Sequence, residues 1–266
     1  LGLIGIIYSL LLPNIYKSEA LLAPVEETSL IDGALSQYSA LAGFAGIDLP
    51  NSDQSGNANK AVELIISLDF FENYLMPKIF LPDLMALKSW EDKKNIIIYD
   101  DSIFQKDSNI WVRDFSYPQK LIPSAQESYE VFTEEHLRIN QDKVSGYITL
   151  SVEHQSPLIA KQWVEIIFEE VNSFYSQKDK ESAEKAVIYL NEQIASTSLL
   201  EIREVTTKLL EKEFQKLTLV EANKDYVFEY IYPPSVMEKK SKPNRLLIVI
   251  LFVVFGGFLG MIIVLF

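Results

Sequence analysis

The two ends of this 266-residue chain are apolar, and every charged side chain lies between them. The last 21 residues, Leu246–Phe266, contain no charged residue and no Asn, Gln, Ser or Thr. As a helix they would span about 31 Å, close to the roughly 30 Å hydrocarbon core of a bilayer. The sequence therefore predicts a transmembrane helix over 246–266.

The first 12 residues, Leu1–Leu12, are nearly as apolar but too short to cross a bilayer. Because the chain begins with Leu rather than Met, we interpret them as the C-terminal part of a first transmembrane helix whose start is missing. They could instead be the tail of a secretory signal sequence. The following residues, 13–16 (PNIY), do not resemble a small-x-small cleavage site, which favours a retained membrane anchor.

The intervening segment, 13–245, carries 24 Lys and Arg and 37 Asp and Glu, so it must lie in water. A net charge of −13 argues against nucleic acid as a partner, because few phosphates could be neutralised. The chain has no cysteine and therefore no disulfide framework or thiolate metal site. Charge does not fix which side of the membrane this domain faces, because the positive-inside rule weakens beside long translocated domains.

Hydrophobic periodicity predicts a base domain over 13–156 that mixes helices and strands. A helix after Pro123 is expected to be capped by Ser124, with Glu127 completing a capping box. The other expected elements are a strand over 15–22, helices over 29–44 and 60–75, a loop over 48–57, short helical pieces ending near Trp90, an irregular stretch over 91–122 with a buried run at 96–99 and Trp111 as its anchor, and a hairpin of strands 136–140 and 144–153 around 141–143.

The longest expected element is a helix over 157–196, about 60 Å long, which no Gly or internal Pro interrupts. Its middle, 176–182 (SQKDKES), is polar on every face, which is typical of a helix passing through water between two packing environments. We expect the first half to pack on the base and the second half to stand clear. A second helix over 199–221 would return antiparallel to it, giving a hairpin arm over 157–225, and a strand over 226–232 would rejoin the base sheet beside the hairpin strands.

Residues that could perform chemistry are few. His136 and His154 are interpreted as polar residues at strand ends near solvent, since metal sites normally have three or more converging ligands. The adjacent carboxylates Asp100–Asp101 and Glu134–Glu135 are interpreted as solvated, because neighbouring side chains point apart. We predict no catalytic residue, no metal site and no cofactor.

Three groups of residues near the C-terminus are candidate functional positions. Gly256, Gly257 and Gly260 form a small-residue cluster that would let helices pack closely in lipid, although glycine is also common in membrane helices. The second group is a stiff proline-rich linker, and the third is a basic flank that could bind acidic headgroups or only solubilise the helix end. The linker prolines are Pro233, Pro234 and Pro243, and the basic residues are Lys239, Lys240, Lys242 and Arg245.

Four ordered motifs across the chain resemble the chain-length determinant family, the polysaccharide co-polymerases of the Gram-negative inner membrane. They are LLLPNIYKSEALLAP at the first anchor, ITLSVEHQSPLIAKQW where the hairpin meets the long helix, YLNEQIASTS at the arm tip and YVFEYIYPPSVMEKKSKPNRLLIVI before the second anchor. The resemblance implies an α+β protein with a membrane-proximal α/β base, a protruding antiparallel helical hairpin and two flanking transmembrane helices. It also implies a periplasmic main domain and ring-shaped homo-oligomers.

The resulting interpretation has five segments: 1–12 first membrane helix, 13–156 base, 157–225 arm, 226–245 return strand and linker, and 246–266 second membrane helix. We expect a non-enzymatic regulator of the chain length of lipopolysaccharide O-antigen or a related surface glycan. Its partners would be further copies of itself, the membrane, an O-antigen-type polymerase and the growing polysaccharide. Two alternatives stay open: a two-pass sensory receptor, which would need an output module after 266, and a glycan-modifying enzyme using Asp100 or Asp101.

Overall fold

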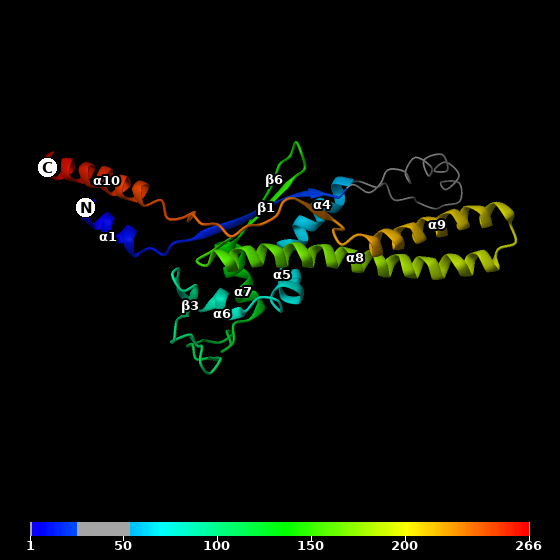
Figure 1. Ribbon diagram of the computed structural model, residues 1–266, viewed down its shortest axis with the longest axis horizontal. Helices are drawn as coiled ribbons and strands as arrows, with labels where there is room; N and C mark the ends of the chain where they lie inside the picture. The colour runs from blue at the N-terminus through cyan, green and yellow to red at the C-terminus, as the bar shows by residue number, and fades with distance from the viewer. Residues whose placement is uncertain (1, 26–53, 266) are drawn as a thin grey trace.

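The structure is a computed structural model that describes residues 2–25 and 54–265. A base built on a β-sheet occupies the middle of the molecule, a two-helix arm extends from one end, and the chain termini lie together at the other (Figure 1). The helix expected over 29–44 and most of the loop expected over 48–57 lie outside the described residues.

The base sheet is entirely antiparallel, with the strand order β6-β7-β1-β8. The strands predicted from the sequence are present as β1 (Tyr16–Pro24), β6 (Leu137–Gln141), β7 (Ile148–His154) and β8 (Phe228–Tyr232). The return strand β8 lies at the sheet edge on β1, with β1 between it and the hairpin strands. The N-terminal strand thus joins the last strand to the rest of the sheet, a pairing between segments about two hundred residues apart.

The strand predicted over 144–153 forms over 148–154 and is covered on both faces. Ile148, Leu150 and Val152 point into the main core, and Ser151 and Glu153 on the opposite face are buried as well. β7 lies in the interior of the sheet rather than at an edge. On its polar face the Ser151 hydroxyl donates to the carbonyl of Arg138, and the Glu153 carboxylate accepts from Lys242. Its turn is also longer than predicted, because the Asp142 carboxylate accepts the backbone N–H groups of residues 144 and 145 and delays the start of the strand.

The long helix α8 (Pro157–Ser196) forms with the predicted bounds. Its first half packs across β1 and β7, and Trp163, Ile167 and Val171 are buried in the main core. Beyond residue 172 only Ala183 of α8 is buried, against the antiparallel helix α9 (Leu200–Ala222). Figure 1 shows the two helices running side by side beyond the base, as the sequence predicts.

The helix predicted over 60–75 is divided. α4 (Gln54–Ile65) ends before Ser67, whose hydroxyl caps the next turn by accepting the N–H of Phe70 at 3.2 Å. The short α5 (Leu68–Phe70) then continues into a π-helical turn, η1 (Phe71–Leu75). Apolar periodicity continues through the break, so the capping serine rather than the pattern of apolar residues marks it.

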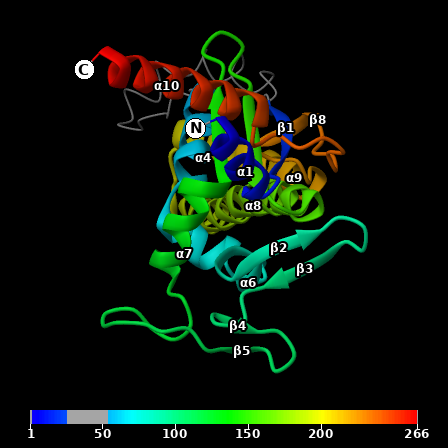
Figure 2. The same cartoon turned by 90° about the vertical axis from the view of Figure 1, so that its left-hand side faces the viewer.

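The stretch expected to be irregular contains two small hairpins beside α6 (Leu81–Met85). One pairs β2 (Leu87–Glu91) with β3 (Ile96–Tyr99), and the other pairs β4 (Phe104–Gln105) with β5 (Ile110–Trp111). Both lie to one side of the main sheet (Figure 2). Only Tyr99 of the run 96–99 is buried, and Trp111 packs on Phe104 with ring centroids 5.2 Å apart, which confirms Trp111 as an anchor.

The helix after Pro123 is α7 (Ala125–Val131), and Ser124 caps it by accepting the N–H of Glu127 at 3.3 Å. The capping box is not completed, because the Glu127 carboxylate accepts hydrogen bonds from Arg113 instead. α7 continues into a second π-helical turn, η2 (Phe132–His136). The guanidinium of Arg113 also donates to the carbonyls of Lys120 and Leu121, which ties the preceding loop to α7.

The apolar ends form α1 (Gly2–Leu11) and α10 (Arg245–Leu265), which pack on each other. Over the part of the chain that the structure describes, no helix combines the length and apolarity needed to cross a membrane. The predicted helix over 246–266 is therefore present, while its transmembrane role is not confirmed.

Candidate functional site

The linker between β8 and α10 does not hang free but runs back along β1. After Pro233 and Pro234 the chain turns beside the strand, and the buried hydroxyl of Ser18 donates to the carbonyl of Ser235 at 2.9 Å. Further along, Ile15 forms an antiparallel bridge with Lys242, with N–H to O distances of 2.9 and 3.2 Å. Pro243 follows this bridge directly, so all three linker prolines lie in a segment fixed to the base.

A charged pair strengthens the same attachment. The ammonium group of Lys242 donates to the Glu153 carboxylate at 2.6 Å, and the Glu153 side chain is only 8% exposed. A nearly buried carboxylate needs such a partner, because burying an unpaired carboxylate costs on the order of several kcal/mol of folding free energy. Glu153 lies on β7, so this contact joins the linker to a strand in the interior of the base sheet.

Two more residues of the basic flank bind the end of α1. Lys240 and Arg245 both donate to the side-chain oxygen of Asn14, at 3.0 and 3.1 Å, and Arg245 also donates to the carbonyl of Ser9 at 3.1 Å. A carbonyl in the last turn of a helix lacks an intrahelical donor, so a guanidinium satisfies it well. We call this set of contacts, made by Lys240, Lys242 and Arg245 with Ser9, Asn14 and Glu153, the linker clamp.

The clamp changes the interpretation of the predicted basic flank. Three of its four residues are engaged by protein atoms, and Lys239 is not among the residues of the clamp. Their main structural effect is to hold the C-terminal end of α1 against the start of α10.

A close contact between α1 and α10 continues beyond the clamp. A Cβ atom added at Gly5 would lie 2.6 Å from the Cβ of Phe252, so only a glycine fits there without moving the helices. The ring of Phe252 also meets that of Tyr8, with centroids 6.1 Å apart. Figure 2, which looks at this end of the molecule, shows the two helices together.

Within the glycine cluster predicted in the second helix, Gly257 does not make this contact. Gly256 is half-buried and Gly257 is exposed, and a Cβ added at Gly257 would meet no described atom within 4 Å. Gly260 belongs to the same helix, one turn beyond Gly256. Large apolar side chains on the outer faces of both helices are exposed: Ile6, Ile7, Leu10 and Leu11 on α1, and Leu246, Ile250, Val253, Val254, Phe255, Phe258 and Met261 on α10.

At the opposite end of the base, one asparagine fixes the start of the arm. Asn172 of α8 is 3% exposed, and its side-chain oxygen accepts the backbone N–H groups of Tyr226, Val227 and Phe228 at 3.1, 2.7 and 3.0 Å. Its amide nitrogen donates to the Phe228 carbonyl at 3.0 Å. These bonds, which we call the arm root, satisfy four backbone groups at the point where the chain leaves α9 and enters β8.

Along the arm, ionic and polar contacts join α8 to α9 in the segment that the sequence marks as polar on all faces. Asp179 accepts from Lys216 at 3.2 Å and from the hydroxyl of Tyr226 at 2.8 Å, and Lys180 pairs with Glu221. The polar middle of α8 thus makes specific contacts with the return helix, where the sequence predicted only passage through water.

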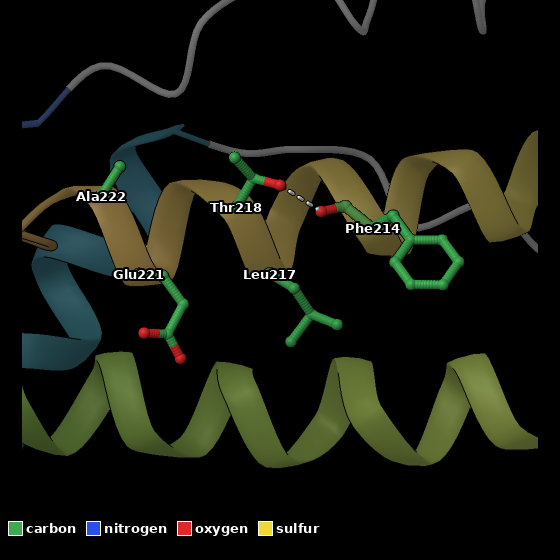
Figure 3. Close-up of a pocket in the computed structure, with 5 residues that line it drawn as sticks. All are labelled: Phe214, Leu217, Thr218, Glu221 and Ala222. Atoms are coloured by element: carbon green, nitrogen blue, oxygen red, sulfur yellow. Dashed lines mark hydrogen bonds between the residues drawn. The ribbon is translucent and has the colours of Figure 1, made fainter.

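A shallow hollow of about 470 Å³ lies on α9 between Phe214 and Ala222. In Figure 3 Leu217 and Glu221 extend toward α8, while Thr218 donates a hydrogen bond to the Phe214 carbonyl at 2.9 Å. Its lining is mainly apolar and its one carboxylate is paired with Lys180, so it does not assemble an acid, a base and a nucleophile.

Among the residues weighed for chemistry, the carboxylates lie as predicted and the histidines do not. Asp100 accepts the N–H and hydroxyl of Ser102 in an exposed turn, which lowers the pKa of its carboxyl group. Glu134 and Glu135 are exposed. His136 and His154, interpreted as strand ends near solvent, are both buried under the start of α8, so that interpretation was wrong. Among the described residues no group of three or more His, Asp or Glu could hold a metal ion.

Sequence reasoning missed Asn14, Glu153, Asn172 and Gly5. The available signals were weak: Asn172 directly follows the apolar stripe position Val171, and Gly5 interrupts an otherwise bulky apolar run. Their partners lie between 54 and 247 residues away along the chain, so local patterns cannot reveal them.

No protein-family model and no curated protein sequence matches the chain. Its structural neighbours are polysaccharide co-polymerases and O-antigen chain-length regulators. A fragment of WzzB, a polysaccharide co-polymerase from Salmonella Typhimurium, aligns at 14% identity and a TM-score of 0.35, covering 86% of this chain and 100% of the fragment.

Two further solved structures align over comparable lengths. A full-length bacterial polysaccharide co-polymerase shares 14% identity at a TM-score of 0.36, over 99% of this chain and 92% of its own. A mutant of the Shigella flexneri lipopolysaccharide O-antigen chain-length regulator shares 12% identity at 0.30, over 85% and 100%.

Proposed function

We propose that this chain is a non-enzymatic regulator of polysaccharide chain length, of the lipopolysaccharide O-antigen or a related surface glycan, which acts as an oligomeric co-polymerase with a membrane polymerase. The observation that carries the proposal is that one base sheet holds both the arm and the paired apolar helices through buried polar contacts. Asn172 fixes the arm to β8, and Glu153 fixes the linker to β7. The resemblance of four sequence motifs to the chain-length determinant family supports the same function.

In this proposal α1 and α10 lie in the inner membrane and the base and arm lie in the periplasm. The exposed apolar faces of both helices support a lipid environment, since contiguous surfaces of this kind are unusual on a soluble monomer. The composition of 246–266, without a charged residue, supports a membrane span of the required length. Gly256, Gly257 and Gly260 would then let membrane helices pack closely against one another.

The rest of the molecule fits a scaffold that binds rather than one that catalyses. The paired Lys and Glu residues of the arm and the apolar hollow on α9 offer surfaces to further copies, to the polymerase or to the growing glycan. A ring of copies would limit how long the polymerase stays on one chain, either by measuring the polymer along the arms or by fixing the number of polymerase molecules engaged.

The test is a deletion of the gene in the strain that carries it, followed by electrophoresis of its surface polysaccharide. We expect the modal chain length to be lost and to return when the wild-type gene is supplied, while sugar incorporation continues. An unchanged length distribution would refute the proposal, and loss of all polymer would assign an enzymatic role instead. The mass of the detergent-purified protein separately tests whether it assembles into a homo-oligomer.

A further inference from the structure

Two buried histidines beneath the start of α8 have no role in the clamp or the arm root. His136 is the last residue of η2 and His154 the last residue of β7, and they are 9% and 1% exposed. Their ring centroids are 5.6 Å apart, and both rings meet Trp163 of α8, at 5.3 and 5.1 Å. They are also the only two histidines in the sequence.

The hydrogen bonds of His154 require its neutral form. Its Nδ1 atom accepts the backbone N–H of Ser156 at 2.9 Å, so this nitrogen must carry a lone pair. Its Nε2 atom lies 3.1 Å from the carbonyl oxygen of Asp83, which can only accept, so this nitrogen must carry the hydrogen. One tautomer of the neutral imidazole therefore satisfies both partners.

Protonation of His154 would break this arrangement at a defined atom. A hydrogen on Nδ1 would face the N–H of Ser156, placing two donors against each other in a buried position. Ser156 is the N-cap of α8, and its carbonyl accepts the first hydrogen bond of that helix, from Ala160. The residue that would move is thus the one that starts the arm helix.

His136 couples to the same site. Its Nδ1 atom lies 2.6 Å from the carbonyl of Glu153 and donates to it. If both rings were charged, two cations would lie side by side in a buried site, each opposing the other's protonation. Burial lowers the pKa of His136, and burial followed by the neighbouring His136 lowers the pKa of His154 to about 4.

Within residues 2–25 and 54–265, the charged groups around the pair supply no partner for a second proton. The Asp83 carboxylate accepts from the hydroxyl of Tyr99, and the Glu153 carboxylate pairs with Lys242. Glu135 raises the pKa of His136 and Arg138 lowers it, so their effects oppose each other. From α8 the residue in contact with both rings is Trp163, which carries no charge.

We propose that His136 and His154 form an acid-sensitive latch, which keeps the junction of β7, α6 and α8 closed only while both imidazoles are neutral. In acid the junction opens, and the arm helix loses its fixed attachment to the strand that also holds Lys242 of the linker clamp. This inference concerns the fold and does not depend on the proposed function.

Titration of the full chain in detergent tests the first half of the latch. Because there are only two histidines, NMR with selectively labelled histidine gives two resolvable ring signals. We expect both rings to titrate at midpoints below that of a free imidazole, because burial in the folded protein disfavours their charged forms. Midpoints near the free value of about 6.5 in the folded protein would overturn the proposal.

Hydrogen exchange tests the second half. Between pH 7 and pH 5 the opening equilibrium of the segment 151–164, after correction for intrinsic exchange, should rise about 20-fold from His154 alone. The control is the double variant His136→Asn, His154→Asn, whose amides keep an acceptor toward Ser156 and a donor toward Glu153. In this variant the opening equilibrium should rise less than about 3-fold between pH 7 and pH 5. The remaining rise would come from carboxylates, which contribute equally in the native chain and in the variant.

An equal rise in the variant, or no rise in the native chain, would overturn the latch. If the double variant fails to fold, the native chain still tests the latch. The histidine NMR signals and the hydrogen exchange of 151–164 must then change over the same pH range. A change in one measurement without the other would overturn the proposal.

Discussion

Asn172 and Phe228 bond through both ends of the asparagine side chain, with the Oδ1 atom 3.0 Å from the Phe228 nitrogen and the Nδ2 atom 3.0 Å from its carbonyl oxygen. This is the pairing that a neighbouring strand would offer to β8, here supplied by a helix. This pairing lets the edge strand β8 begin at buried residues without leaving a backbone N–H or carbonyl group unsatisfied.

Replacing Asn172 with Ala should destabilise the protein strongly. The change leaves three N–H groups without their acceptor, two of them on buried residues, at a cost of about 3 kcal/mol. In a protein of this size the melting temperature should fall by about 8 °C in a circular dichroism melt. The matched control is Asn73→Ala, because that amide bonds Asp69 on an exposed helix surface and should shift the melt by less than about 2 °C. Equal shifts in the two variants would contradict the assigned role.

The pair of Lys242 and Glu153 should show measurable coupling. In a double-mutant cycle of Lys242→Met and Glu153→Gln, we expect a coupling free energy of about 1 kcal/mol, since the lysine is partly in solvent and the carboxylate is not. The same cycle with Lys239→Met in place of Lys242→Met should give a value near zero. A cycle in which Lys239 couples as strongly as Lys242 would mean that the linker takes another path.

Gly5 should tolerate no side chain, whereas Gly257 should tolerate a large one. Leucine at position 5 would place carbon where Phe252 lies and force α1 away from α10, at about 1–3 kcal/mol, while leucine at 257 would enter open space. Because the chain has no cysteine, spin labels on Leu11→Cys and Leu246→Cys report only the spacing of the two helix ends. Dipolar broadening between the two spin labels should weaken in Gly5→Leu and persist in Gly257→Leu. The reverse result would contradict the packing of α1 on α10 at Gly5.

The ion pair of Arg113 and Glu127 predicts a defined pH dependence. The hydrogen bond from Arg113 lowers the pKa of the Glu127 carboxyl below its usual value, so the folded state binds the proton less readily than the unfolded chain. This contribution to stability is complete above the usual value of 4.5 and is lost as the pH falls through the lower folded pKa. The stability difference between the wild type and Glu127→Gln should therefore shrink between pH 6 and pH 3 in urea titrations. The control is Glu130→Gln, a change at an exposed position on the same helix, which should alter the free energy of unfolding by less than about 0.5 kcal/mol.

Much of the secondary structure follows from local patterns in the sequence. The extent of α8 was predicted, because Pro157 at its first position and the absence of any Gly or further Pro before Ser196 need no distant partner. The cap at Ser124 was likewise predictable, since the acceptor and the N–H it satisfies are three residues apart. The break at Ser67 was missed, because the apolar stripe runs through it and masks the cap.

The candidate site was less predictable, because burial is a property of the whole fold. A histidine at the end of a predicted strand looks solvated in sequence, but the α8 crossing places His154 under Trp163. A lysine beside an apolar helix looks like a lipid contact, but the reversal of the linker places Lys242 on Glu153, 89 residues earlier.

What the sequence determined by itself was the division of this protein into apolar ends, a charged middle and one long helical arm, since each follows from composition or short-range periodicity. What only the tertiary structure decided was which polar groups lose water and which partners they then find. Residues such as Asn172, Glu153 and His154 acquire their roles from segments that chain connectivity leaves far apart and that packing of the base sheet against α8 brings together.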